Sequence, residues 1–206
     1  MDLKLASKQK DGRKNVNNNK KIINIYSLLF FGIFTYFIAR GVYLSFVIAP
    51  YIPPDESYHI DLINLYSQVW GMVNVEMIGD IGYYLPPRLQ PYLYHFLMGK
   101  ILWLNYFSLQ DYIFLRLVNL IISLCSLIII YKTINELFSS KTFNIFSILI
   151  VSNIGMFSFL SSSVSYDNLT NLISAMLIFF IIKFYKSLNI KLLTLQSILI
   201  LIGLLI

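Results

Sequence analysis

Two carboxylates and an imidazole lie close together in the stretch 53–59, which reads Pro-Pro-Asp-Glu-Ser-Tyr-His. Asp55 and Glu56 offer oxygen atoms that can take a proton from an acceptor or bind a divalent cation. His59 shares a helix face with Asp55 if a helix begins at Glu56. The stretch directly follows a long apolar segment, and charge is costly next to hydrocarbon. It is therefore the first candidate for a site of chemistry.

Further polar residues are expected on the same side of the membrane as this stretch. Asp167 supplies a third carboxylate, and all three carboxylates are candidates for catalysis. The guanidinium groups of Arg88 and Arg116 suit a phosphate, because they offer paired hydrogen-bond donors. The other candidates for contact with a substrate are His59, Gln90, Tyr94 and Lys100, and His95 is expected on the same face.

Each candidate also has a purely structural interpretation. Asp55 belongs to a residue type that is preferred as an N-cap, and Asp167 can cap the helix that follows it. Glu56 in a first helical turn would complement the helix dipole. The two histidines have no close His or Cys neighbours in the sequence, which favours hydrogen bonding over metal binding. Arg116 can also extend to lipid headgroups.

The composition of the 206-residue chain excludes an ordinary soluble domain. Hydrophobic residues make up 57% of it and charged residues 13%, which is typical of a polytopic membrane protein. The formal net charge is +6, but seven of the 16 basic residues lie within residues 1–21. This distribution indicates a cytoplasmic N-terminal tail rather than nucleic-acid binding. We expect this polar, Lys- and Asn-rich tail to be disordered.

The apolar segments predict an all-α fold, with a transmembrane domain over residues 22–206. About five spans are expected, at residues 22–39, 113–131, 143–160, 169–184 and 192–206. The outer loop 53–112 would hold two juxtamembrane helices. The first would be amphipathic, because Ile60, Ile63, Tyr66, Val69 and Trp70 recur at helical spacing.

The segment 91–107 is expected to be the second juxtamembrane helix rather than a span. If it crossed the membrane, the five lysines between residues 132 and 191 would lie outside, against the positive-inside rule. Lys100 would also lie in the bilayer core, where a lysine costs about 2.5–3.5 kcal/mol.

The order of these features resembles the N-terminal part of the GT-C superfamily of membrane glycosyltransferases, over roughly residues 22–186. That superfamily includes the protein O-mannosyltransferases and the lipid A aminoarabinose transferases. The resemblance rests on Pro53-Pro54-Asp55-Glu56 after the first span, Gln90-Pro91-Tyr92-Leu93-Tyr94, Arg116, and Asp167-Asn168-Leu169 after a serine-rich turn.

The resemblance implies a transferase that takes a sugar from a polyprenyl-phosphate-linked donor at the outer face of the plasma membrane. Asp55 matches the first-loop acid that acts as base or metal ligand, and Asp167 matches the second-loop acid. With Glu56 they could share a divalent cation. Gln90 stands where many relatives have a lysine that contacts the lipid phosphate. An arginine of this chain would then take that role.

Relatives of this kind are longer, so we expect an incomplete GT-C module, which a C-terminal partner half could complete. The alternative is a non-catalytic membrane scaffold or an inactive remnant of such an enzyme. A transporter is disfavoured, because it would place charges in the middle of the spans.

Overall fold

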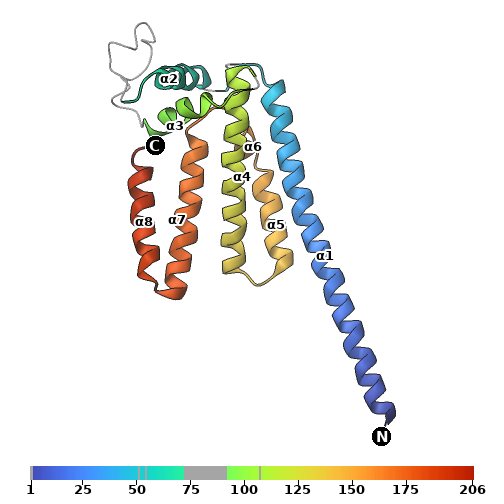
Figure 1. Cartoon of the computed structure of the whole chain (residues 1–206). Coiled ribbons are helices and arrows are strands. Elements are labelled where there is room, and N and C mark those ends of the chain that lie inside the picture. The colour runs from blue at the N-terminus through green and yellow to red at the C-terminus, as the bar shows by residue number, and fades with distance from the viewer. Residues whose placement is uncertain (1, 51, 54, 72–91, 107) are drawn as a thin grey trace.

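The computed structural model describes residues 2–50, 52, 53, 55–71, 92–106 and 108–206. Within these residues the regular elements are all helices (Figure 1). They are α1 (Asp2–Val47), α2 (Glu56–Gln68), α3 (Leu93–Leu102), α4 (Asp111–Leu137), α5 (Lys141–Ser152), α6 (Gly155–Leu160), α7 (Asp167–Ser187) and α8 (Ile190–Gly203).

Three helices in the described part of the chain are long and apolar enough to cross a membrane. They are α4, α7 and the part of α1 from Ile25 to Val47. The 27 residues of α4 and the 21 residues of α7 reach about 40 Å and about 32 Å at 1.5 Å per residue, against a hydrocarbon core of roughly 30 Å. α5 and α8 are shorter apolar helices. The chain is an all-α membrane protein, as predicted.

The apolar helices α1, α4, α5, α7 and α8 run side by side, while α2 and α3 lie across one end of them (Figure 1). The C-terminal end of the chain returns to this end, where the backbone N–H of Leu93 donates to the carbonyl oxygen of Leu205 at 3.1 Å. The pair of juxtamembrane helices predicted for the outer loop is confirmed. We call the end of the bundle that carries α2 and α3 the cap end.

α4 is the central helix, because both apolar cores are built on it. One core joins α4 to the cap helices and to α7 and α8, and it contains Ile60, Ile63, Tyr94, Met98, Leu115, Val164, Ile173, Leu199 and Ile206. The other core joins α4 to α1 and α5, and it contains Ile33, Phe34, Phe37, Leu120, Leu127, Ile145 and Ile148. Opposite faces of one helix thus hold the two halves of the bundle together.

The predicted amphipathic face of α2 packs against α3. Ile60, Ile63 and Tyr66 are buried, whereas Trp70 lies beyond the helix end and is 77% exposed. The two helices approach closely at Gly99, where a Cβ atom would lie 2.8 Å from the backbone nitrogen of Ser67. Only glycine allows this contact without a shift of the backbone.

The segments differ from the predicted ones in two places. The span predicted over residues 143–160 is divided into α5 and α6, because the chain leaves the helix at Asn153, whose side-chain amide donates to the carbonyl oxygen of Leu149 at 2.8 Å. The tail, which we predicted to be disordered, continues α1 as helix back to Asp2. No proline interrupts that continuation, and extending an existing helix is easier than starting one.

This arrangement predicts that the residues before α4 and the α4–α5 turn lie on opposite sides of the membrane. In a Cys125→Ser background, Asp111→Cys and Lys141→Cys should each react with a membrane-impermeant thiol reagent, but from opposite sides. Labelling of intact cells and of inverted vesicles measures this. Reaction of both variants from the same side would mean that α4 does not cross the membrane.

Candidate functional site

A buried ion pair joins the start of α2 to α4 at the cap end. The carboxylate of Glu56 accepts two hydrogen bonds from Arg116, from Nε at 2.8 Å and from Nη2 at 2.6 Å. Both side chains are fully buried. A bidentate ion pair of this kind is among the stronger polar contacts in proteins, because charge and geometry match at both hydrogen bonds.

The same two side chains also bind two other segments. The guanidinium of Arg116 donates to the carbonyl oxygens of Ser45 at 3.1 Å, Ile48 at 2.7 Å and Ala49 at 3.3 Å, at the C-terminal end of α1. A cation is favourable there, because the last carbonyls of a helix lack helical partners. Glu56 Oε1 accepts from the backbone N–H of Val164 at 3.0 Å. The pair therefore holds α1, α2, α4 and the segment before α7 together.

This geometry gives Glu56 and Arg116 roles that differ from the expected ones. All five N–H donors of Arg116 are occupied by the protein, so the arginine neither extends to lipid headgroups nor offers a donor to a phosphate. Glu56, expected as a catalytic carboxylate, is instead the partner of that arginine. Both residues join segments at the cap end.

Asp55 has a different environment from its neighbour. Its side chain is exposed, and its backbone is in the left-handed region with φ at 60°. It takes the N-cap position of α2, yet its side chain makes no capping hydrogen bond. Left-handed backbone costs about 1–2 kcal/mol for most residues and is tolerated best by Gly, Asn and Asp. The fixed position of Glu56 holds the exposed carboxylate of Asp55 at this turn.

Asp167 lies near the start of α2, although it follows far later in the sequence. It is the first residue of α7, it is partly buried, and its carboxylate accepts from Ser165 Oγ at 3.1 Å. Two contacts bring its segment to α2: the bond from Val164 to Glu56, and the ring of Tyr166 against that of His59 at 5.4 Å between centroids. Asp55 and Asp167 therefore both lie beside the contact between the start of α2 and the segment that precedes α7.

The two histidines form a buried pair between α2 and α3. His59 Nδ1 and His95 Nε2 are 3.0 Å apart, and the residues are 4% and 1% exposed. Burial lowers the pKa of His59 to about 4, because desolvation disfavours the imidazolium form. His59 is therefore neutral at pH 7, and its tautomer decides which of the two rings donates the hydrogen bond.

Tyr94 belongs to a buried polar network that the sequence did not predict. Its hydroxyl donates to Asn119 Oδ1 at 3.0 Å, and the amide of Asn168 donates to the same oxygen at 3.0 Å. Ser123 Oγ donates to Asn168 Oδ1 at 2.7 Å. The network links α3, α4 and α7. Tyr94 is fully buried, so its hydroxyl is used for a hydrogen bond inside the protein.

The spacing of polar residues in α4 could have predicted this network from the sequence. Arg116, Asn119 and Ser123 lie three and four residues apart in an apolar helix, so they share one face. Each is at most 1% exposed. Polar groups inside a transmembrane helix usually face protein rather than lipid, and such a stripe predicts a buried interface.

Lys100, which we expected at a phosphate, is bonded to the end of α2. Its Nζ donates to the carbonyl oxygens of Tyr66 at 2.9 Å and Val69 at 2.6 Å, and it lies 4.4 Å from the ring centroid of Trp70. A lysine at this position stabilises the last carbonyls of the helix. Arg88 and Gln90 lie outside the described residues.

The remaining question about the site is whether it could hold a metal ion. Within the described ranges, no group of three His, Cys, Asp or Glu side chains is arranged to bind one. Glu56, one of the three carboxylates that could share a cation, is held by Arg116 instead. In the part of the chain that the structure describes, Asp55, Glu56 and Asp167, which could have shared a divalent cation, do not form a ligand set for one.

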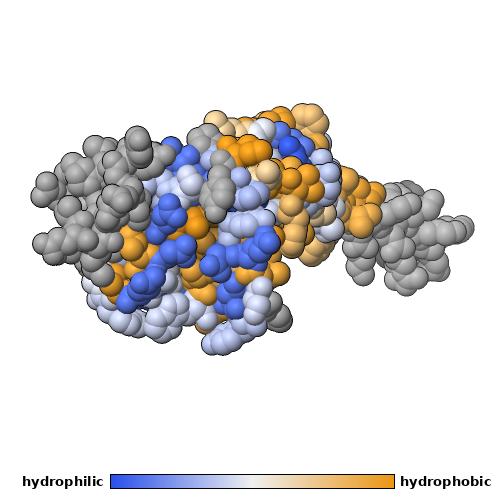
Figure 2. All heavy atoms as spheres, turned by 90° about the horizontal axis from the view of Figure 1, so that it is seen from above, coloured by the Kyte–Doolittle hydropathy of each residue, from blue (hydrophilic) through white to orange (hydrophobic). Residues whose placement is uncertain are grey.

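The cap end also differs in surface character from the bundle. Hydrophilic residues gather over the middle of this end face, with apolar residues between them and mainly toward α1 (Figure 2). The fold and the site together define a polytopic helical membrane protein with a polar, internally braced cap.

Comparisons with protein-family models, with curated proteins and with solved structures found no match to this chain.

The ion pair predicts an unequal effect of two glutamate substitutions. Glu56→Gln leaves the charge of Arg116 buried without a counter-charge, so the protein should lose about 3–5 kcal/mol of stability. The matched substitution is Glu136→Gln, which removes exposed ion pairs to Lys183 and Lys186 and should change little. The thermal midpoint and the yield of folded protein in detergent measure both. Equal midpoints for the two variants would contradict a structural role for Glu56.

Proposed function

We propose that the chain is a membrane glycosyltransferase, or the N-terminal part of one, that transfers a sugar from a polyprenyl-phosphate-linked donor to an acceptor. One observation carries the proposal. The exposed carboxylate of Asp55 is held in left-handed backbone, and the turn that carries Asp167 lies beside the start of the same helix. Backbone in sparsely populated regions is concentrated at functional sites. The braced ion pair behind Asp55 would keep the carboxylate in place during a reaction.

The chemistry of the proposal needs one positioned base. Asp55 would accept the proton of an acceptor hydroxyl or amine as that group forms a bond to the anomeric carbon of the sugar. The bond from this carbon to the phosphate oxygen breaks, and the lipid phosphate leaves with the electron pair. A single displacement of this kind inverts the anomeric centre. Asp167 would orient the acceptor from the neighbouring turn.

The phosphate must be held by a residue other than the two cations that are already engaged. Arg116 is bonded to Glu56 and to α1, and Lys100 is bonded to the end of α2. Of the cations expected at a phosphate, Arg88 remains in the proposal. Arg88 is assigned this role because it is the remaining cation of the three, Arg116 and Lys100 being bonded within the protein.

The proposal places the cap end at the outer face of the plasma membrane and the N-terminus in the cytoplasm. The lysines at the opposite end of the described bundle support this orientation, because cytoplasmic loops carry an excess of Lys and Arg. These lysines are Lys132, Lys141, Lys183, Lys186 and Lys191. Polyprenyl-phosphate sugars at the outer leaflet would then reach Asp55 directly.

A non-catalytic scaffold is the second candidate. It is favoured because charged side chains of the cap end already bind other parts of the protein. Glu56, Arg116 and Lys100 all serve to join helices, which a purely structural protein also needs. A scaffold of this kind would use the cap end to hold partners in the membrane, and Asp55 would have no role in chemistry.

Asp55→Asn tests the proposal with little structural disturbance. Asn is tolerated in left-handed backbone as well as Asp is, and it caps a helix about as well. The substitution removes the base, so transfer should fall by about 10²–10⁴-fold at unchanged abundance. The assay follows consumption of a radiolabelled polyprenyl-phosphate hexose by membranes that contain the protein.

Asp61→Asn is the matched control, because Asp61 is an exposed carboxylate on the same helix. It should leave transfer unchanged. Equal transfer by the parent and the Asp55→Asn variant would remove Asp55 from the mechanism. No consumption of the donor by the parent would favour the scaffold.

A further inference from the structure

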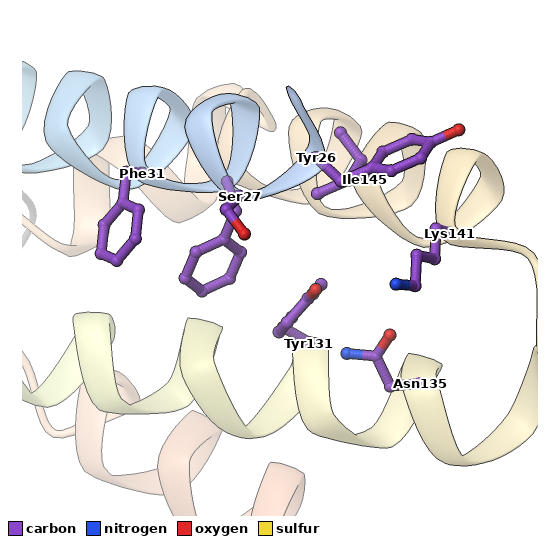
Figure 3. Close-up of a pocket in the computed structure, with 8 residues that line it drawn as sticks. Tyr26, Ser27, Phe31, Tyr131, Asn135, Lys141 and Ile145 are labelled. Carbon is purple, nitrogen blue, oxygen red and sulfur yellow. The ribbon is translucent and has the colours of Figure 1, made fainter. Parts of the chain in front are cut away.

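A second polar site lies at the end of the bundle opposite the cap. A pocket of about 320 Å³ opens there between α1, α4 and α5, which is within the range of small-ligand sites. Half of its lining residues are aromatic, and Asn135 and Lys141 lie toward the α4–α5 turn (Figure 3). The lining residues are Tyr26, Ser27, Phe30, Phe31, Tyr131, Asn135, Lys141 and Ile145.

Two nitrogen donors enter the pocket from different helices. Lys141 at the start of α5 and Asn135 near the end of α4 both extend their side-chain nitrogens into the space between the helices (Figure 3). The hydroxyl of Tyr131 lies on the same side of the gap (Figure 3). An ammonium, an amide N–H and a phenol together match the oxygen atoms of a phosphate, which accepts hydrogen bonds and carries negative charge.

The amide of Asn135 is oriented by a buried neighbour. Asn144 is 2% exposed, and its Nδ2 donates to Asn135 Oδ1 at 2.6 Å and to the carbonyl oxygen of Phe138 at 3.1 Å. Because the oxygen of Asn135 is occupied, its NH₂ group faces the pocket. A hydrogen bond of 2.7 Å between Tyr26 and Thr142 joins α1 to α5 beside the same pocket. Hydrogen bonds thus join α5 to both α4 and α1 beside the pocket.

We propose that this pocket binds the phosphate of an anionic phospholipid from the leaflet at the lysine-rich end of the bundle. The headgroup phosphate would lie between Lys141, Asn135 and Tyr131. An acyl chain would then follow the aromatic wall toward Phe31, which is 66% exposed on the outer side of α1.

The apolar wall favours a lipid over a free phosphate ion. A free ion would use only the donors, and Phe30 and Phe31 would contribute nothing to its binding. Phe30 packs against Tyr131 at 4.5 Å between ring centroids, so the donor end and the apolar end of the pocket are continuous. Surrounding lysines also attract an anionic membrane surface. The inference is independent of the proposed transferase, because it concerns the other end of the protein.

Native mass spectrometry of the detergent-purified chain tests the proposal with phosphatidylglycerol as the probe. The parent should bind phosphatidylglycerol, and diacylglycerol with the same acyl chains should bind at least tenfold more weakly because it lacks the phosphate. Lys141→Gln should weaken phosphatidylglycerol binding about tenfold or more, since it removes a charged hydrogen-bond donor. Tyr131→Phe keeps the wall intact and should weaken binding by a smaller factor.

Lys132→Gln is the matched control, because Lys132 is an exposed lysine at the same end that does not line the pocket. It should leave binding unchanged. An equal loss in Lys132→Gln and Lys141→Gln would show attraction by bulk charge and overturn the site. Displacement of the lipid by millimolar inorganic phosphate would show a free-phosphate site and overturn the lipid assignment. Unchanged binding in Lys141→Gln would also contradict the proposal.

Discussion

The fully buried ion pair between Glu56 and Arg116 is the constraint on which the cap end depends. Four segments meet at these two side chains: the end of α1, the start of α2, α4, and the turn before α7. A buried charge that loses its partner is strongly destabilising. The pair therefore favours this arrangement of the segments, because separating Glu56 from Arg116 inside the protein would leave a buried charge without a counter-charge.

The consequence of this constraint for function lies in the neighbouring residue. Asp55 precedes Glu56 directly, so the position of its exposed carboxylate follows from that of the ion pair. Val164, bonded to the same glutamate, places Asp167 at the next turn. One buried pair thus lies next to the exposed Asp55 and the partly buried Asp167, while Glu56 and Arg116 themselves are bonded to each other. The proposed function uses this arrangement, because a reacting group held in place by rigid neighbours loses little freedom in the reaction.

The helices and their broad arrangement could be predicted from the sequence, but the pairing of charges could not. Hydropathy and the distribution of lysines gave the juxtamembrane position of α3. They could not show that Arg116 binds Glu56, because the pair joins residues 60 positions apart and other acids and cations lay in reach. For the same reason Tyr94 and Lys100 were expected at a substrate, whereas tertiary contacts use their polar atoms inside the protein.

Hydrogen exchange followed by mass spectrometry in an Arg116→Ala variant tests the central claim most directly. If the ion pair joins the segments, peptides from the end of α1, the start of α2 and residues 161–168 should lose protection together, while the middle of α7 keeps it. Loss of protection confined to α4, or no change in any of the three peptides, would contradict the account.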